Sequence, residues 1–175
     1  MKILGLLRHA KSDWGQSDKR DFDRGLNTRG RKGAKVIGDH IREHGIKWDR
    51  LVASPAERVK LTLSEALPEL EPKWEDRLYL AGTDTIMEVV REVGGDADAL
   101  LLAGHNPGLG DMLFELVAPK NENALYDEAK VKFPTAAFAV FELDIDDWTD
   151  LRDGCGTLVH FARPRDLDAE LGPEY

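Results

Sequence analysis

Short apolar runs that end in polar residues recur along the chain and predict strands buried on both faces. Such runs cover residues 2–7, 50–53 and 99–103. A near-continuous apolar strand is typical of a parallel sheet that helices cover on both sides. Residues 28–44 and 83–93 instead carry apolar or small residues at helical spacing, and a glycine follows each segment directly. The pattern therefore predicts strands and helices in alternation.

The remaining segments extend this alternation. Ser54-Pro55-Ala56-Glu57 predicts a helix start, with serine as N-cap, proline at the first helical position and glutamate where a capping box expects it. The further elements that we predict are the continuation of this helix to about residue 67, a strand over 73–79, a helix from Asn106-Pro107 through 117, a polar loop over 119–129, and closing strands over 136–143 and 156–161. The whole pattern predicts a three-layer α/β/α sandwich around a mostly parallel central sheet, in one domain spanning residues 1–175.

Composition and charge exclude several classes of protein. Hydrophobic residues make up 42% of the 175 residues, and no apolar run approaches the roughly 18 residues of a membrane span. The first residues lack the long apolar segment of a secretory signal, and the single cysteine, Cys155, cannot form a disulfide framework, so we expect a cytoplasmic protein. The net charge of −9 opposes nonspecific nucleic-acid binding, and an anionic substrate would need a local basic pocket.

Charged and polar side chains follow three of the predicted strands at the points where those strands end. Arg8-His9 follows the first strand, Ser54 to Arg58 follows the second, and His105 follows the strand over 99–103. Because the carboxyl ends of parallel strands share one edge of a sheet, we expect these residues to meet at one small site. Taken singly, Arg8-His9 and Arg58 fit solvated positions equally well, and a cap accounts for Ser54. The prediction therefore rests on the set of Arg8, His9, Arg58 and His105 together.

Residues 8–26 form a long polar stretch beside this expected site. Loops of that length inside a compact domain are usually functional. Lys11, Lys19, Arg20 and Arg24 in this stretch either recognise a substrate or are simply solvated, and the charge pattern favours neither interpretation.

A metal site and several nucleotide or hydrolase sites can be weighed on motifs alone. His40-Ile41-Arg42-Glu43-His44 matches the H-x-x-E-H pattern of inverted zinc peptidases. Histidines four residues apart are also common on solvated helix faces, and Gly45 ends this helix at once, so we do not assign a zinc site. The chain contains no G-x-x-x-x-G-K-[ST], no G-x-G-x-x-G and no G-x-S-x-G motif, which excludes the corresponding NTPase, dinucleotide-binding and serine-hydrolase classes.

The order of the polar motifs resembles that of a known family. The motifs are Leu7-Arg8-His9-Ala10-Lys11-Ser12-Asp13-Trp14, Asp21-Phe22-Asp23-Arg24, Leu26-Asn27-Thr28-Arg29-Gly30, Ser54-Pro55-Ala56-Glu57-Arg58, Gly104-His105-Asn106-Pro107-Gly108 and Phe133-Pro134-Thr135-Ala136-Ala137. Over residues 2 to about 166 the chain resembles the histidine phosphatase (phosphoglycerate mutase-like) superfamily, and within it the SixA-like phosphohistidine phosphatases.

The resemblance implies a role for each residue of the set. It makes His9 the nucleophile that attacks phosphorus and becomes a phosphohistidine, which water then hydrolyses. Arg8, Arg58 and His105 fall on the phosphate-pocket positions, where their charges would hold the equatorial oxygens. The attacking nitrogen must be unprotonated, so the other ring nitrogen of His9 should donate to a nearby acceptor. The resemblance implies no metal and no cofactor.

One departure from the family pattern bears on the substrate. Many members carry an acidic residue for the leaving group where this chain has Leu80, and Asp76 and Asp84 are replacements by sequence proximity only. An alkoxide, whose conjugate acid compares with water at about 15.7, is hard to expel without an acid, whereas an imidazole has a reference pKa near 6.5. The sequence therefore predicts a phosphatase acting on phosphohistidine in a protein.

Three alternatives stay open at the level of the sequence. The first is a broad phosphomonoesterase for small-molecule or aryl phosphates. The second is a non-catalytic phosphoprotein-binding module with the same pocket, which the intact set of Arg8, His9, Arg58 and His105 disfavours. The third is a mutase, which the short chain and Leu80 disfavour. The expected partner in each case is a phosphorylated protein or small molecule, and the sequence does not indicate an oligomeric state.

Overall fold

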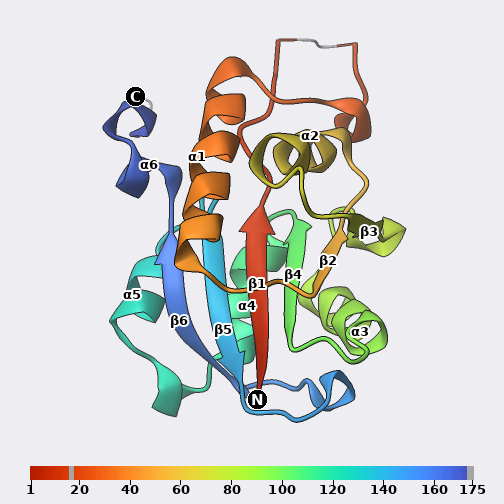
Figure 1. Cartoon of the computed structure of the whole chain (residues 1–175), viewed down its shortest axis with the longest axis vertical. Helices are drawn as coiled ribbons and strands as arrows, with labels where there is room; N and C mark the ends of the chain where they lie inside the picture. The colour runs from red at the N-terminus through yellow and green to blue at the C-terminus, as the bar shows by residue number, and fades with distance from the viewer. Residues whose placement is uncertain (16–17, 173–175) are drawn as a thin grey trace.

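The computed structural model describes residues 1–15 and 18–172 and is built around a six-stranded sheet in the order β3-β2-β4-β1-β5-β6 (Figure 1). The strands are β1 (Lys2–Arg8), β2 (Arg50–Ala53), β3 (Pro72–Trp74), β4 (Ala99–Gly104), β5 (Phe138–Leu143) and β6 (Gly156–Ala162). Pairing is parallel from β3 through β2 and β4 to β1, and β5 is antiparallel to both β1 and β6. The predicted α/β fold with a mostly parallel sheet is confirmed.

Helices cover both faces of this sheet. They are α1 (Thr28–His44), α2 (Glu57–Ala66), α3 (Thr83–Val93), α4 (Gly108–Leu116), α5 (Ala124–Ala129) and the short α6 (Pro164–Leu167). The alternation along β1 shows how the layers form, because Leu4 and Leu6 pack with residues of α3, α4 and α5, whereas Leu7 packs with residues of α1 and α2. All three leucines are fully buried, so β1 is apolar on both faces as its sequence predicts.

Several predicted boundaries are wrong, and two of the three differences involve a side-chain cap that periodicity does not reveal. The helix expected from Ser54 begins at Glu57, with Ala56 as its N-cap. The strand expected over 73–79 ends at Trp74, and a 3-10 turn follows in which the Glu75 side chain accepts from the Arg77 amide. Residues 119–129, expected to be a loop, contain α5, whose first turn is capped by the Asn123 side chain.

The starts of the later elements also shift by one or two residues. α4 begins at Gly108, with Pro107 before it, although the Asn106 side chain does accept from the Gly110 amide at 3.1 Å. The first closing strand begins at Phe138, two residues later than expected. Just before it, Ala136 has a φ of 59° and donates its amide to the His9 carbonyl at 2.9 Å.

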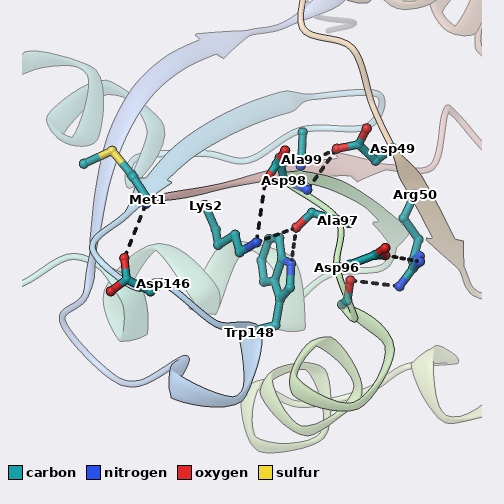
Figure 2. Close-up of polar contacts among 11 residues, drawn as sticks. Met1, Lys2, Asp49, Arg50, Asp96, Ala97, Asp98, Ala99, Asp146 and Trp148 are labelled. Atoms are coloured by element: carbon teal, nitrogen blue, oxygen red, sulfur yellow. Dashed lines mark hydrogen bonds and ion pairs between the residues drawn. The ribbon is translucent and has the colours of Figure 1, made fainter.

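Polar contacts tie together the N-terminal ends of the parallel strands, which is the edge of the sheet opposite His9 (Figure 2). Lys2 and the indole of Trp148 both donate to the Ala97 carbonyl, at 3.0 and 2.7 Å. One oxygen of Asp49, just before β2, accepts from the amides of Asp98 and Ala99 at 2.9 and 3.0 Å. These contacts fix β1, β2 and β4 at one end, so the other end is where side chains can face a ligand. In the described ranges, no helix combines the length and the apolarity that crossing a bilayer requires.

Candidate active site

Sheet order brings the two histidines of the predicted set side by side. β1 and β4 are parallel neighbours with Arg8 opposite Gly104, so His9 and His105 follow strands that end together. The His9 amide donates to the Gly104 carbonyl at 3.1 Å, and the centroids of the two imidazole rings lie 5.4 Å apart. Arg58 reaches the same edge from the first turn of α2. The structure thus brings together the four residues that the sequence singles out.

A cleft of about 360 Å³ opens at this edge. Three of the four residues, Arg8, His9 and Arg58, line it, whereas the ring of His105 lies next to His9 without lining the cleft itself. The other lining residues are Lys11, Ser12, Trp14, Asp21, Lys132, Pro134 and Thr135. The lining therefore carries four basic side chains and one carboxylate, which suits an anion of high charge.

Hydrogen bonds fix the orientation and the tautomer of His9. Its Nδ1 lies 2.7 Å from the Ala10 carbonyl oxygen, and because a carbonyl can only accept, Nδ1 carries the proton. The Nε2 atom is then left with a free lone pair, as a nucleophile requires. The backbone is held as well, since the Ala10 amide donates to the Thr62 hydroxyl of α2 at 2.9 Å. His9 therefore presents the reactive form of its ring.

Burial and positive neighbours keep both imidazoles neutral in the free protein. Burial, followed by the charges of Arg8, His105 and Arg58, lowers the pKa of His9 to about 3 against the opposing effect of the Ala10 carbonyl. Burial, followed by the charge of Arg58, lowers the pKa of His105 to about 4. A bound dianion would oppose these effects, because a nearby negative charge favours imidazolium.

Arg8 is half-buried and incompletely paired. Its Nη1 donates to the Phe133 carbonyl at 3.1 Å, and the same carbonyl accepts from Asn106 at 2.8 Å. Its Nε has no hydrogen-bond partner among the described residues, and neither does Nδ1 of His105. A buried donor without a partner costs about 1–3 kcal/mol, and an oxyanion in the cleft would supply acceptors close by. Burial, with Arg58, lowers the pKa of Arg8.

Arg58 is held by Asp21, which sequence analysis did not single out. The Arg58 side chain donates through Nη1 to the Asp21 carbonyl at 2.7 Å and through Nη2 to its carboxylate at 3.1 Å. The Tyr79 hydroxyl also donates to this carboxylate. The bond from Tyr79 lowers the pKa of Asp21 despite the opposing effect of burial, and Arg58 adds to the lowering. Asp21 is therefore an ionised counter-charge that orients Arg58.

Asp21 and Tyr79 differ in how far the sequence could have pointed to them. Asp21 stands in one of the motifs that carry the family resemblance, so the motif could have marked it. Tyr79, by contrast, follows a 3-10 turn that periodicity does not predict. Its ring also stands edge-on to His105, with the centroids 5.5 Å apart. No sequence signal marks that contact.

Ser54 has a role that helix capping does not explain. Its hydroxyl lies 2.8 Å from Nε2 of His105 and also accepts from the Ala56 amide at 3.3 Å. The prediction that an N-cap fully accounts for Ser54 is therefore wrong, since the helix begins three residues later and the hydroxyl, fully buried, contacts His105. Ser54 holds the ring of His105 in place.

Neither candidate acid lies in the cleft. Asp76 and Asp84 are both exposed, and neither is among the lining residues. Leu80, at the position where the family resemblance leads one to expect an acid, is 54% exposed and has a φ of 52°. Among the described residues, the one carboxylate lining the cleft is the ionised Asp21.

The polar stretch over residues 8–26 contributes unequally to the cleft. Lys11 lines the cleft, and so does Trp14, over whose ring the Arg24 guanidinium lies at 3.7 Å. Lys19 and Arg20 are exposed, and Arg20 pairs with Asp23 at 2.7 Å. Residues 16 and 17 of the stretch lie outside the described residues. Of the four basic residues for which sequence left substrate recognition and solvation equally open, Lys11 alone lines the cleft in the described part of the chain.

The H-x-x-E-H histidines do not line this cleft and have a different partner. His40 and His44 lie on one face of α1, and His160 of β6 stacks on both, with ring centroids at 5.0 and 4.1 Å. The Nε2 atoms of His40 and His160 are 2.8 Å apart. Across the described ranges, no group of three or more side chains is arranged to hold a metal ion. His40 and His44 therefore serve to pack α1 against β6.

Comparison with known proteins agrees with the fold and the motifs. The profile of the histidine phosphatase superfamily (branch 1) matches residues 4–80. A protein named SixA from Nakamurella multipartitia is 31% identical, with a TM-score of 0.82 over 93% of this chain and 96% of that one. SixA from Agrobacterium tumefaciens is 28% identical, with a TM-score of 0.75 over 93% and 98%. An uncharacterised protein of Mycobacterium tuberculosis is 32% identical over 160 residues, which are 91% of this chain and all of that protein.

The chain belongs to the histidine phosphatase superfamily and to its SixA-like branch. This membership supports a phosphatase, and hence a hydrolase, acting on a phosphorylated substrate.

Proposed function

We propose that the protein hydrolyses phosphohistidine in a partner protein through a covalent intermediate on His9. The observation that carries the proposal is the cleft itself, which holds a nucleophile and four basic side chains but, among the described residues, no carboxyl group able to give up a proton. The names of the two SixA proteins assign a phosphohistidine phosphatase activity to them provisionally, and the proposal extends it to this chain.

Binding relies on charge and on donors already in place. Arg8 and Arg58 would hold the equatorial phosphoryl oxygens, and His105, positioned by Ser54, would add a third donor once the dianion raises its pKa. Because the cleft is partly shielded from water, these contacts are stronger than they would be at an exposed surface.

Neither of the two chemical steps needs a proton from an acidic side chain of the protein. Nε2 of His9 forms a bond to phosphorus while the bond from phosphorus to the substrate imidazole breaks, and that imidazole, already protonated on its other nitrogen, leaves neutral. His9 keeps its Nδ1 proton, so the phosphorylated ring is positive and the Ala10 carbonyl stabilises it. Water then attacks phosphorus, the Nε2–P bond breaks, and phosphate and neutral His9 result.

The missing acid decides the substrate class. A serine alkoxide would have to leave with a conjugate acid comparable to water at about 15.7, whereas the imidazole of phosphohistidine has a reference pKa near 6.5. Nine units correspond to roughly 12 kcal/mol of leaving-group stability at 1.36 kcal/mol per unit. The cleft therefore suits phosphohistidine, or at most an activated aryl phosphate.

The test compares wild type with His9→Ala on three substrates: a phosphohistidine protein, a phosphoserine peptide and an aryl phosphate. Wild type should hydrolyse the phosphohistidine protein fastest and the phosphoserine peptide about a hundred to ten thousand times more slowly, since leaving-group protonation typically contributes 10²–10⁴-fold. His9→Ala should lose all activity, and labelled phosphate should be trapped on wild type alone.

The control is His44→Ala, which removes a histidine outside the cleft and should keep both activity and trapping. Efficient hydrolysis of the phosphoserine peptide would contradict the substrate class. Faster hydrolysis of the aryl phosphate than of the phosphohistidine protein would indicate the broad phosphomonoesterase. Tight binding of the phosphoprotein with neither turnover nor trapping would indicate a binding module. We also propose that catalysis is independent of metal, so that a chelator leaves the rate unchanged and does not distinguish wild type from His44→Ala.

A further inference from the structure

A second hollow of about 150 Å³ adjoins the cleft. The end of β1, the first turns of α1, residues 132–136 and the segment from Arg163 to Gly172 surround it. Lys11, Lys132, Pro134 and Thr135 line both the hollow and the cleft, so the two are immediate neighbours. We call this hollow the side pocket. It is large enough for a group of about the size of benzene, and a carboxylate is smaller.

The side pocket is basic in a protein whose net charge is −9. Its lining includes Lys11, Arg29, Lys132, Arg163 and Arg165, and none of the described residues that line it is acidic. The charged residues of this lining are thus positive, although the protein as a whole is negative. At physiological salt, salt ions screen the interaction between exposed charges beyond about 8 Å. An anion at this edge of the protein is therefore attracted locally despite the overall charge.

The five cations are not equally available. Arg163 is engaged by Asp166 at 2.8 Å and by Glu128 at 2.7 Å. Arg29 donates to the carbonyls of Glu170 and Gly172. Lys132 and Arg165, in contrast, form no ion pair with any residue in the described ranges 1–15 and 18–172, although the charge of Arg165 contributes to lowering the pKa of Asp166. Arg165 is half-buried, so salt and water screen its charge less than they screen the charge of an exposed side chain.

We propose that the side pocket binds a carboxylate of the phosphorylated protein, so that the enzyme prefers phosphohistidines with acidic neighbours. The proposal rests on the proposed function, because it assumes that a protein-borne phosphoryl group occupies the adjoining cleft. The shared residues Lys11 and Lys132 place the carboxylate next to that phosphoryl group. Two anionic groups of one substrate would then be held by two neighbouring basic surfaces.

The experiment uses two phosphohistidine peptides that differ only in carrying glutamate or glutamine at the two positions on each side of the phosphohistidine. Wild type should cleave the glutamate peptide with a kcat/KM about tenfold higher, and Arg165→Gln should reduce this ratio about threefold, as expected for one partly exposed ion pair. The ratio cancels any general loss of activity. Arg152→Gln removes the same charge from an exposed position outside both hollows and should keep the wild-type ratio.

Two further measurements separate the possible failures. Phosphoramidate has no second anionic group, so its hydrolysis by wild type reports on the cleft alone. Affinities of the His9→Ala protein for the two peptides, measured by calorimetry, report on the side pocket even if wild type cleaves neither peptide. Equal kcat/KM and equal affinity for both peptides would overturn the side pocket and leave the proposed function standing. A preference that Arg152→Gln reduces as much as Arg165→Gln would also overturn it, because a general field would then explain the effect.

Discussion

The charge states of two imidazoles decide what the cleft can do. His9 and His105 lie with their ring centroids 5.4 Å apart, beside two guanidinium groups, and both are buried. Imidazolium is unfavourable in such surroundings because it loses solvation and meets like charge. The same surroundings favour a phosphoryl dianion, which supplies the missing negative charge. The free cleft is thus a set of neutral rings and positive arginines prepared for an anion.

This argument predicts the titration of the two rings. In the free protein, nitrogen NMR of the histidine side chains should show His9 as the neutral Nδ1–H tautomer down to about pH 4, because its pKa is lowered to about 3. Tungstate, a tetrahedral oxyanion, should raise the pKa values of His9 and His105, since negative charge favours the protonated ring. The His9 signals are those that are missing from the spectra of the His9→Gln protein. A His9 ring that titrates near the ordinary 6.5 in the free protein would refute this account of the cleft.

At the scale of elements, close backbone contacts place α1 against its neighbours. A Cβ atom on Gly38 would lie 2.1 Å from the Ala66 carbonyl oxygen of α2, and one on Gly30 would lie 2.2 Å from the Lys11 carbonyl oxygen. Both distances are too short for any side chain, so glycine permits α1 to approach α2 and the segment that follows His9. The packing of α1 therefore supports the cleft indirectly.

Two glycine substitutions on the same helix test this packing. Gly38→Ala should lower the free energy of unfolding by about 1–3 kcal/mol, because the methyl group overlaps backbone atoms that cannot move aside cheaply. Gly33→Ala is the matched control, since its nearest neighbour would be a Pro164 side-chain atom at 3.8 Å. It should leave stability unchanged or raise it by up to about 1 kcal/mol through helix propensity. Urea unfolding of both variants measures the difference, and equal effects would show that the α1–α2 contact is not tight.

At the scale of the whole molecule, histidines whose pKa values are lowered in the folded state link stability to pH. Desolvation, together with the nearby His44 and His40, lowers the pKa of the half-buried His160 to about 4, and desolvation also lowers the pKa of the exposed His44. The folded protein keeps these rings neutral, while the unfolded chain takes up protons below about pH 6.5. The free energy of unfolding should therefore be fully present above pH 6.5 and fall progressively towards pH 4. His9 and His105 contribute with the same sign.

Urea unfolding at pH 7, 6 and 5 measures this dependence. His160→Gln removes one titrating ring and relieves its neighbours, so the loss of stability between pH 7 and pH 5 should be smaller than in wild type. The quantity compared is the difference in the free energy of unfolding between pH 7 and pH 5. A destabilisation that is the same at both pH values cancels in this difference. A steeper loss in the variant would contradict the lowered pKa of His160.

Local sequence patterns are enough to predict most of the elements and the polar residues at their ends. Helices over 28–44 and 83–93 and strand β2 were predicted with the observed bounds, because periodicity, glycine stops and apolar runs are local properties of the chain. The positions of Arg8, His9, Arg58 and His105 at element ends followed directly. Short elements such as α5 were missed because six residues give too little periodicity to recognise.

Which side chains meet depends on long-range packing that local patterns do not encode. Asp21 and Arg58 are 37 residues apart, and Ser54 and His105 are 51 apart, so no local pattern links them. The stacking of His160 on His40 and His44 depends on α1 lying beside β6, and the side pocket depends on the segment after β6 returning to the start of α1. Hydrophobic periodicity states which face of an element is buried, but the order of strands and the packing of helices determine what that face touches.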